Sequence, residues 1–398
     1  MAVSSGASTP GTRNPSPWES GAPDRPPRPL RPHLSELRLS AFAGHRGVGL
    51  PLGAVTLLAG PSGAGKSSAL RAYEALARLA GGAPVGEVFR EPVACVPERV
   101  APDAQGRRGF RIGCTADGPE GPVRLDLAVQ AEPELRIVGE RLTARGVVLL
   151  ETALRDPARR VVQAAWHTGG QAPVVRAPLS DDRLGTALLP LRVAGTTDGE
   201  RQVLAAAEQM VVALRSVFAC DPLPDRMRAP VPAGSGRLFG GCDNLADVLW
   251  RTRAECARRH DRFVQEVAAG CAGPVVDVFA EPAGHGTVRA VLDRGDGLRT
   301  DFARLGDGEL RYLALALVLL TGPGVLEVDP PGEVPAALRA LTVLADGLDR
   351  QVDAAQRRAL LRLATKSARD GHIRLLGAVS DASWAAGQSG VTVVHLRA

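Results

Sequence analysis

Lysine is almost missing from this chain of 398 residues: only Lys66 and Lys366 occur, and arginine carries nearly all of the positive charge. The formal net charge is +5, of which the first 32 residues hold +2 (four arginines against two carboxylates), so +3 remains for everything after them. Such a near-neutral body gives no compositional support for nucleic-acid binding. Aromatic residues make up only 4% of the chain and do not alternate with basic ones, which argues against a platform for stacking single-stranded bases.

Paired cysteines and long apolar runs are missing as well. The six cysteines form no CxxC pair and no cluster with histidine at zinc-binding spacing, so we expect buried free thiols in a reducing compartment. The N-terminus has no apolar core of a secretory signal, and no uninterrupted apolar run is long enough to cross a bilayer. These absences argue against a disulfide scaffold, a zinc protein and a membrane protein, and they favour a cytoplasmic location.

What the chain does have is enough apolar residues, 45%, for a sizeable core. Residues 1–33, rich in Pro, Ser and Arg, have few large aliphatic side chains and are expected to form a disordered tail. Short alternating runs between Gly- and Pro-rich breaks predict an antiparallel β lobe over 91–165. Further patterns predict helices over 199–218 and 243–269, a strand over 287–294, a helix over 308–321, a strand over 324–328, helices over 334–348 and 353–369, and strands over 372–379 and 391–396.

The stretch GPSGAGKS, residues 60–67, matches G-x-x-x-x-G-K-[ST] and lies between a strand-like run and a helical one. Glycines at this spacing let the backbone wrap around phosphate oxygens, and the N–H groups of the helix N-terminus strengthen the grip. Lys66 would reach the β- and γ-phosphates, Ser67 would bind Mg²⁺, and Ser68 would contact the α-phosphate of a nucleoside triphosphate. The expected nucleotide-binding residues are Gly60, Pro61, Ser62, Gly63, Ala64, Gly65, Lys66, Ser67 and Ser68.

A second group of motifs lies near the C-terminus. RLGDGELRYLALALVLL, residues 304–320, is a Gly-Asp-Gly turn that opens an apolar helix, and the N-terminus of such a helix suits an anion. GVLEVD, residues 324–329, is an apolar run that ends in a carboxylate, where a second Mg²⁺ ligand is needed. Each piece alone is also typical of a helix cap or a strand end. Their order after a phosphate loop favours Asp329 as a metal ligand beside Ser67.

With these motifs the chain resembles the RecF/SMC-like, ABC-type ATPases, especially the bacterial AAA-family predicted ATPases that have a compact head and no coiled coil. The resemblance is carried by residues 42–68, by CDNLADVL (242–249), by LGDGELRYLALAL (305–317) and by the strand ending at Asp329. It implies an α/β fold of the P-loop, ABC/RecF-like head type, with a central mostly parallel sheet, an antiparallel β lobe and a helical insertion. The implied parts of one discontinuous head, 34–398, are the phosphate-loop part 34–90, the β lobe 91–165, the helical insertion 166–285 and the signature and acidic-strand part 286–398.

The same resemblance implies ATP, Mg²⁺ and a second copy of the chain as partners. In the family, the signature turn caps the γ-phosphate of ATP held by the opposite subunit, so that two heads sandwich two ATP molecules. Here that turn would consist of Gly306, Asp307, Gly308 and Glu309. ATP would hold the heads together, and hydrolysis or release would let them part.

Three positions depart from the family pattern. The signature usually offers a serine to the γ-phosphate, and this chain has Gly306 there. After Asp329 the family has a glutamate that orients the attacking water, and this chain has a proline. The next core strand ends at Ser380 or Asp381 instead of a histidine that senses the γ-phosphate. Because positioned acid–base groups contribute about 10²–10⁴-fold to a rate, we expect weak hydrolysis.

The carboxylates that remain as catalytic candidates are Asp329, Glu309 and Glu333, although both glutamates are equally typical of solvated residues at helix starts. Two functions stay open. One is a slowly hydrolysing, dimerising ATPase of DNA repair or chromosome maintenance, with DNA as a partner. The other is a catalytically degenerate nucleotide-sensing scaffold that recruits an unknown protein partner without DNA. A basic helical stretch at 250–262 could face DNA, but its interspersed carboxylates are typical of a solvated surface.

Overall fold

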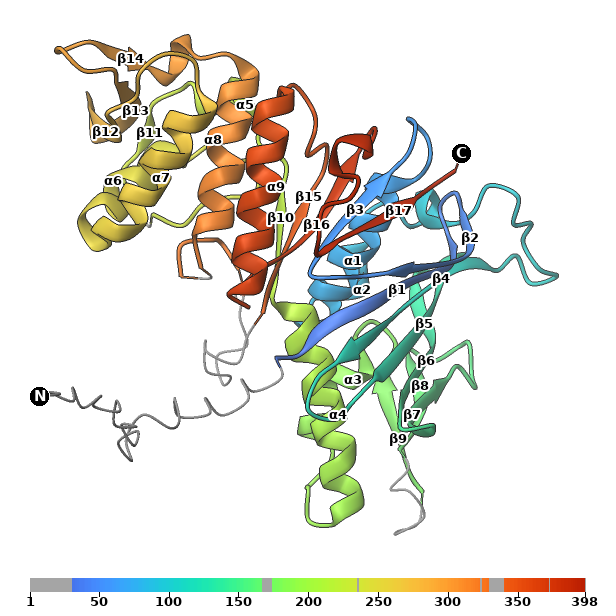
Figure 1. Ribbon diagram of the computed structural model, residues 1–398. Helices are drawn as coiled ribbons and strands as arrows, with labels where there is room; N and C mark the ends of the chain where they lie inside the picture. The colour runs from blue at the N-terminus through green and yellow to red at the C-terminus, as the bar shows by residue number, and fades with distance from the viewer. Residues whose placement is uncertain are drawn as a thin grey trace, which may run out of the picture.

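In the part of the chain that the structure describes, the fold is α/β and is built on three sheets: one parallel sheet of five strands and two antiparallel sheets of eight and four strands. In Figure 1 the eight-stranded sheet lies below and to the right of the parallel sheet, and the four-stranded sheet lies at the upper left. The computed structural model describes residues 31–166, 174–234, 236–322, 324–328, 340–371 and 373–397.

The parallel sheet has the strand order β10-β15-β16-β3-β17, and all neighbouring strands run parallel. Strands β3 and β15 are buried along their whole length, as expected for strands that are covered on both faces. Leu58 packs into the core that includes helix α1, and its neighbour Leu57 packs into the core that includes helices α8 and α9, on the other face. The bounds are β3 Val55–Ala59, β10 Val217–Cys220, β15 Leu341–Ala345, β16 Ile373–Val379, β17 Val391–His395, α1 Lys66–Ala80, α8 Asp307–Leu320 and α9 Ala354–Arg369.

The eight-stranded sheet has the order β2-β1-β4-β5-β6-β7-β8-β9 and is antiparallel throughout. Alternation along β4 places Phe110, Ile112 and Cys114 in the core, where α1 and α4 cover this face of the sheet. The bounds are β1 His33–Phe42, β2 His45–Pro51, β4 Arg108–Asp117, β5 Val123–Glu132, β6 Arg136–Ala144, β7 Val147–Ala153, β8 Val161–Trp166, β9 Val175–Ser180, α2 Val85–Val88, α3 Gly185–Leu188 and α4 Asp198–Arg215.

The four-stranded sheet packs against α6, and α7 packs against α8 and α9. The sequence predicts one helix over 243–269, and that prediction is wrong at Cys256, whose φ of −152° and ψ of 87° separate α6 from α7. The bounds are β11 Val231–Pro232, β12 Asp277–Gly284, β13 Thr287–Asp293, β14 Arg299–Asp301, α5 Pro224–Met227, α6 Leu245–Glu255 and α7 Ala257–Gly270.

Two predictions for the strands of the parallel sheet are wrong. Within the described part of the chain, 324–328 joins none of the three sheets, and Leu326 makes an isolated parallel bridge to Leu238. The expected helix over 334–348 contains β15, which pairs with β10 and β16. Both segments contain a short apolar run, and periodicity cannot decide which of two such runs enters a sheet. The expected helix over 199–218 also ends early, at Arg215, and β10 follows directly after Ser216.

Other predictions for the C-terminal half are confirmed. The expected helices over 308–321 and 353–369 correspond to α8 and α9, and the expected strands over 287–294, 372–379 and 391–396 correspond to β13, β16 and β17. Residues 1–30 of the expected tail lie outside the described residues. Among the helices that are described, none has both the length and the apolar character that a bilayer crossing requires.

Candidate phosphate-binding cleft

The loop between β3 and α1 has the conformation of a phosphate cradle. Gly63 and Gly65 have φ values of 85° and 83°, in the left-handed region that glycine adopts without strain. Gly65 is the N-cap of α1, and no side chain caps this helix N-terminus or places a carboxylate in its first turn. Helices α4 and α9, in contrast, have capping boxes. The first N–H groups of α1 therefore remain available to an anion.

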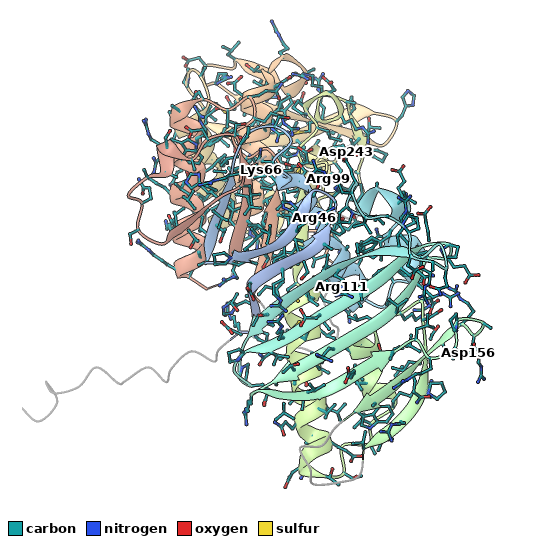
Figure 2. All side chains as sticks on the ribbon, turned by 90° about the vertical axis from the view of Figure 1, so that its right-hand side faces the viewer. Arg46, Lys66, Arg99, Arg111, Asp156 and Asp243 are labelled. Carbon is teal, nitrogen blue, oxygen red and sulfur yellow. The ribbon has the colours of Figure 1, made fainter. Side chains whose placement is uncertain are left out.

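Lys66 lies over this cradle. Its Nζ donates hydrogen bonds to the carbonyl oxygens of Gly60, at 2.6 Å, and Pro61, at 2.8 Å. Figure 2 shows Lys66 where the parallel-sheet half of the molecule meets the eight-stranded sheet. An ammonium group held by loop carbonyls can turn to a phosphate without moving the backbone, because three donors rotate on a flexible stem.

The loop forms one wall of a cleft of about 440 Å³, and the opposite wall comes from the carboxyl ends of β15 and β16. Ligands in open α/β sheets bind at this edge, where parallel strands end together. Asp346 follows β15 directly and lines the cleft with Ser67. The full lining is Ser62, Gly63, Gly65, Lys66, Ser67, Ser68, Asp346, Gly347, Asp349, Arg350, Ala378, Val379 and Ser380.

Asp346, and not a residue of segment 324–328, is thus the strand-end carboxylate that the described residues place beside the loop. Asp329 and Glu333 lie outside the described residues. No group of three or more His, Cys, Asp or Glu side chains in the described ranges is arranged to hold a metal. The pair of Ser67 and Asp346 nevertheless fits Mg²⁺, which is usually held by one or two protein oxygens together with phosphate oxygens and water.

The residue after Asp346 is Gly347, with φ 59°. A Cβ built on it would lie 2.8 Å from Nε and 2.9 Å from Cζ of Arg350, so the arginine side chain covers the space into which a side chain at 347 would grow. By the resemblance described in the sequence analysis, a glutamate is expected directly after the strand-end acid, and this chain has Gly347 there. The expected glutamate is therefore absent whichever acid ends the strand. Asp329 is followed by a proline, and Asp346 is followed by a glycine.

Asp349 is the other carboxylate of the far wall. Its Oδ2 accepts a hydrogen bond of 2.7 Å from the backbone N–H of Ser380, the residue that follows β16. This bond joins the loop after β15 to the end of the next strand and engages one of the two carboxylate oxygens. Ser380, one of the two residues expected at the end of this strand, lines the cleft.

A buried arginine connects helix α8 to the far wall. Arg311 is 2% exposed, and its Nη1 donates to Oδ1 of Asp221, at 3.0 Å, and to the carbonyl of Pro222, at 2.6 Å. Its Nη2 donates to the carbonyls of Asp346, at 3.2 Å, and Gly347, at 3.0 Å. The loops after β10 and β15 are therefore fixed to α8 by one guanidinium group.

The expected signature turn, residues 306–309, does not line the cleft. It lies against Gln351, in the loop that follows β15. A Cβ on Gly308 would meet the carbonyl oxygen of Gln351 at 2.2 Å, so only glycine fits this contact. Asp307 accepts hydrogen bonds from Arg228 and from Nε2 of Gln351, and the bond from Arg228 is the main cause that lowers the pKa of Asp307. Oε2 of Glu309 accepts from the N–H of Gly306, at 3.3 Å, so this carboxylate is occupied at its own helix start.

The structure therefore brings the predicted loop residues together with Asp346, which sequence reasoning missed. LTVLAD, residues 341–346, is an apolar run ending in Asp, as GVLEVD is, so the local pattern does not distinguish Asp346 from Asp329. His45 was missed as well. Its Nε2 lies 2.9 Å from the carbonyl oxygen of Gly65, and no sequence pattern links the two residues.

No protein-family model and no curated protein matches the chain. Solved structures that align with it include an SMC head bound to the C-terminal winged-helix domain of ScpA, with TM-score 0.47 and 12% identity over 87% of this chain and 90% of that chain. The SMC head domain from Thermotoga maritima aligns with TM-score 0.41 and 12% identity, over 88% and 89% of the two chains. An SMC head with an extended coiled coil, bound to the C-terminal domain of ScpA derived from Pyrococcus furiosus, aligns with TM-score 0.44 and 12% identity, over 92% and 94%.

Proposed function

We propose that this chain binds a nucleoside triphosphate, ATP by its resemblance, together with Mg²⁺, and that it acts as a nucleotide-gated switch with little turnover. One observation carries the proposal. An uncapped, glycine-rich helix start faces the strand-end carboxylate of Asp346 across a single cleft. A helix N-terminus attracts phosphate oxygens, and a carboxylate opposite it can hold a cation that those phosphate oxygens share.

Four cleft residues have roles in this proposal. Lys66 leaves the loop carbonyls and binds the β- and γ-phosphates, and Ser68 contacts the α-phosphate. Ser67 and Asp346 hold Mg²⁺, which neutralises the charge of the phosphates when it is bound. The role sequence reasoning gave to Asp329 passes to Asp346.

Slow turnover follows from Gly347. General acid–base catalysis contributes about 10²–10⁴-fold, and a glycine supplies no such group. The bond from Ser380 fixes Asp349 against the end of β16, and Glu309 caps its own helix start outside the cleft lining, so neither carboxylate stands directly after Asp346. This observation favours a binding switch over an ATPase that works by rapid turnover.

The switch operates by pairing of two ABC-type heads, with the signature turn of each copy meeting the γ-phosphate held by the other. What supports this proposal is the connection within one copy between the turn and the cleft. Gly308 packs on Gln351, and Arg311 binds the carbonyls of Asp346 and Gly347. A nucleotide that shifts the loop after β15 would therefore shift α8 and the turn with it. DNA repair or chromosome maintenance stays the setting that the resemblance implies.

Calorimetric titration with ATP and Mg²⁺ tests the binding proposal. Lys66→Ala should weaken ATP binding about 100-fold, because a charge-assisted contact to phosphate is worth about 1.5–3 kcal/mol and Lys66 makes more than one. Lys366→Ala is the matched control, since it removes the other lysine, which is exposed on α9. Equal affinities for the two variants would contradict the assignment of the loop.

Analytical ultracentrifugation of the same proteins tests the switch. The wild type and Lys366→Ala should dimerise with ATP and Mg²⁺ and remain monomeric without them, and Lys66→Ala should stay monomeric in both conditions. Phosphate release measured in parallel should be slow. ATP binding without any change of mass would contradict the pairing of heads and leave a monomeric nucleotide sensor.

A further inference from the structure

A histidine of the eight-stranded sheet, His45, contacts the backbone of the phosphate loop at Gly65. His45 begins β2, and its side chain is buried, at 6% exposure. Its Nε2 lies 2.9 Å from the carbonyl oxygen of Gly65. Because a carbonyl oxygen can only accept a hydrogen bond, Nε2 carries the proton and donates.

The imidazole ring also decides which residue fits at position 65. A Cβ built on Gly65 would lie 2.3 Å from Nε2 and 2.6 Å from Cε1 of His45. The left-handed φ of 83° and the ring thus independently require glycine here. The imidazole ring of His45 lies directly against the backbone of the phosphate loop and sterically prevents this loop from moving towards the eight-stranded sheet.

The hydrogen bond sets the direction of one peptide group. The carbonyl of Gly65 accepts from His45 and from the N–H of Ala69, at 3.0 Å, the first bond of helix α1. In a planar trans peptide the carbonyl of one residue and the N–H of the next point in opposite directions. With the Gly65 carbonyl held towards His45 and the helix, the N–H of Lys66 points outwards, to the anion site.

His45 is itself held by the core of the eight-stranded sheet. It pairs with Phe42 across the turn between β1 and β2. Phe42 is 3% exposed and meets Phe110 edge to face, with ring centroids 5.5 Å apart. The position of the histidine therefore depends on the antiparallel sheet, and not on the parallel sheet from which the loop emerges.

We propose that His45, at the start of β2, is a positioning residue that holds the phosphate loop in its anion-binding conformation and thereby raises nucleotide affinity. The inference rests on the proposed nucleotide site and adds a residue to it. His45 touches no substrate; it acts through the peptide group between Gly65 and Lys66.

Two substitutions distinguish the contribution of the hydrogen-bond donor of His45 from that of its ring. His45→Phe keeps a ring of similar shape and removes the donor, and His45→Gln keeps a donor nitrogen at the same number of bonds from Cα. Affinity is measured with mant-ATP, a fluorescent ATP analogue, in the presence of Mg²⁺. We expect binding about 10-fold weaker for His45→Phe, the effect of one lost hydrogen bond, and within about threefold of wild type for His45→Gln.

Two control variants test whether loss of a histidine elsewhere, or a loss of stability, is enough to weaken nucleotide binding. His285→Phe changes an exposed histidine in the turn between β12 and β13 and should leave the affinity unchanged. Leu127→Ala, in the core of β5, lowers the melting temperature and should leave mant-ATP binding intact well below that temperature. A loss of affinity in Leu127→Ala as large as in His45→Phe would overturn a specific role for the histidine.

Hydrogen exchange without nucleotide tests His45 even if nucleotide binding fails. Peptides covering 60–70 should exchange faster in His45→Phe than in the wild type and in His45→Gln. If the wild type does not bind mant-ATP, the proposed function is wrong, and the exchange data alone still decide the role of His45. Unchanged exchange and affinity in His45→Phe would overturn the inference, and so would a His45→Gln variant that behaves like His45→Phe.

Discussion

The glycine after Asp346 offers a gain-of-function prediction. If slow turnover results from the missing water-orienting group, a carboxylate placed at position 347 should restore it. The substitution Gly347→Glu has two costs. A side chain at φ 59° costs about 1–2 kcal/mol of stability. Its Cβ also meets the guanidinium of Arg350, at 2.8 Å from Nε, which has to move.

The second cost can be removed. The side chain of Arg350 is 52% exposed, and its ion pair with Asp221 is long, at 3.6 Å, so Arg350→Ala should have little effect by itself. We therefore expect the double variant Gly347→Glu with Arg350→Ala to fold, with a free energy of unfolding lower by about 1–2 kcal/mol. Urea denaturation measures this loss.

In the double variant, phosphate release under single-turnover conditions should rise at least about 10-fold, the low end of what a positioned base supplies once imperfect placement is allowed for. Gly347→Gln with Arg350→Ala is the matched control, since it has the same backbone strain and the same length without a base. A glutamate variant that binds ATP like the control and hydrolyses it no faster would show that the missing group at 347 is not what limits turnover.

Three further predictions concern Gly65, Arg311 and Asp307. Gly65→Ala should abolish ATP binding in calorimetric titrations, because the new Cβ would lie 2.3 Å from the ring of His45 at a φ of 83°. Arg311→Met should lower the free energy of unfolding in urea by about 1–3 kcal/mol, because the carbonyls of Pro222, Asp346 and Gly347 lose their charged donor, and it should weaken ATP-dependent dimerisation. Asp307→Asn should lower the melting temperature at pH 7. Because the hydrogen bond from Arg228 lowers the folded-state pKa of Asp307, the wild type should lose this advantage as the pH falls below the ordinary aspartate range and through the lowered pKa.

The loop and its immediate surroundings could be predicted from sequence because the information is local. The strand, the glycines and the helix that follow each other between Val55 and Ala80 each have their own signal, and the structure has all three in that order. The antiparallel lobe could be predicted for the same reason, since strand alternation is read within each strand.

Asp346, the strand-end carboxylate proposed to hold Mg²⁺, could not be predicted, because strand pairing decides which of two acids ends a strand of the parallel sheet. GVLEVD and LTVLAD are both apolar runs that end in Asp. Only the pairing of β15 with β10 and β16 shows that Asp346 ends a strand of the parallel sheet. His45 and Arg311 were missed for a related reason: each acts through contacts with residues far away in sequence, and neither belongs to a pattern.

The Mg²⁺ dependence of ATP affinity in Asp346→Asn and Asp329→Asn tests the site most directly, with Asp261→Asn, exposed on α7, as the control. Titrations with and without Mg²⁺ should show the ion strengthening ATP binding in the wild type, in Asp261→Asn and in Asp329→Asn, and failing to do so in Asp346→Asn. A Mg²⁺ effect that survives in Asp346→Asn and disappears in Asp329→Asn would contradict the cleft described here.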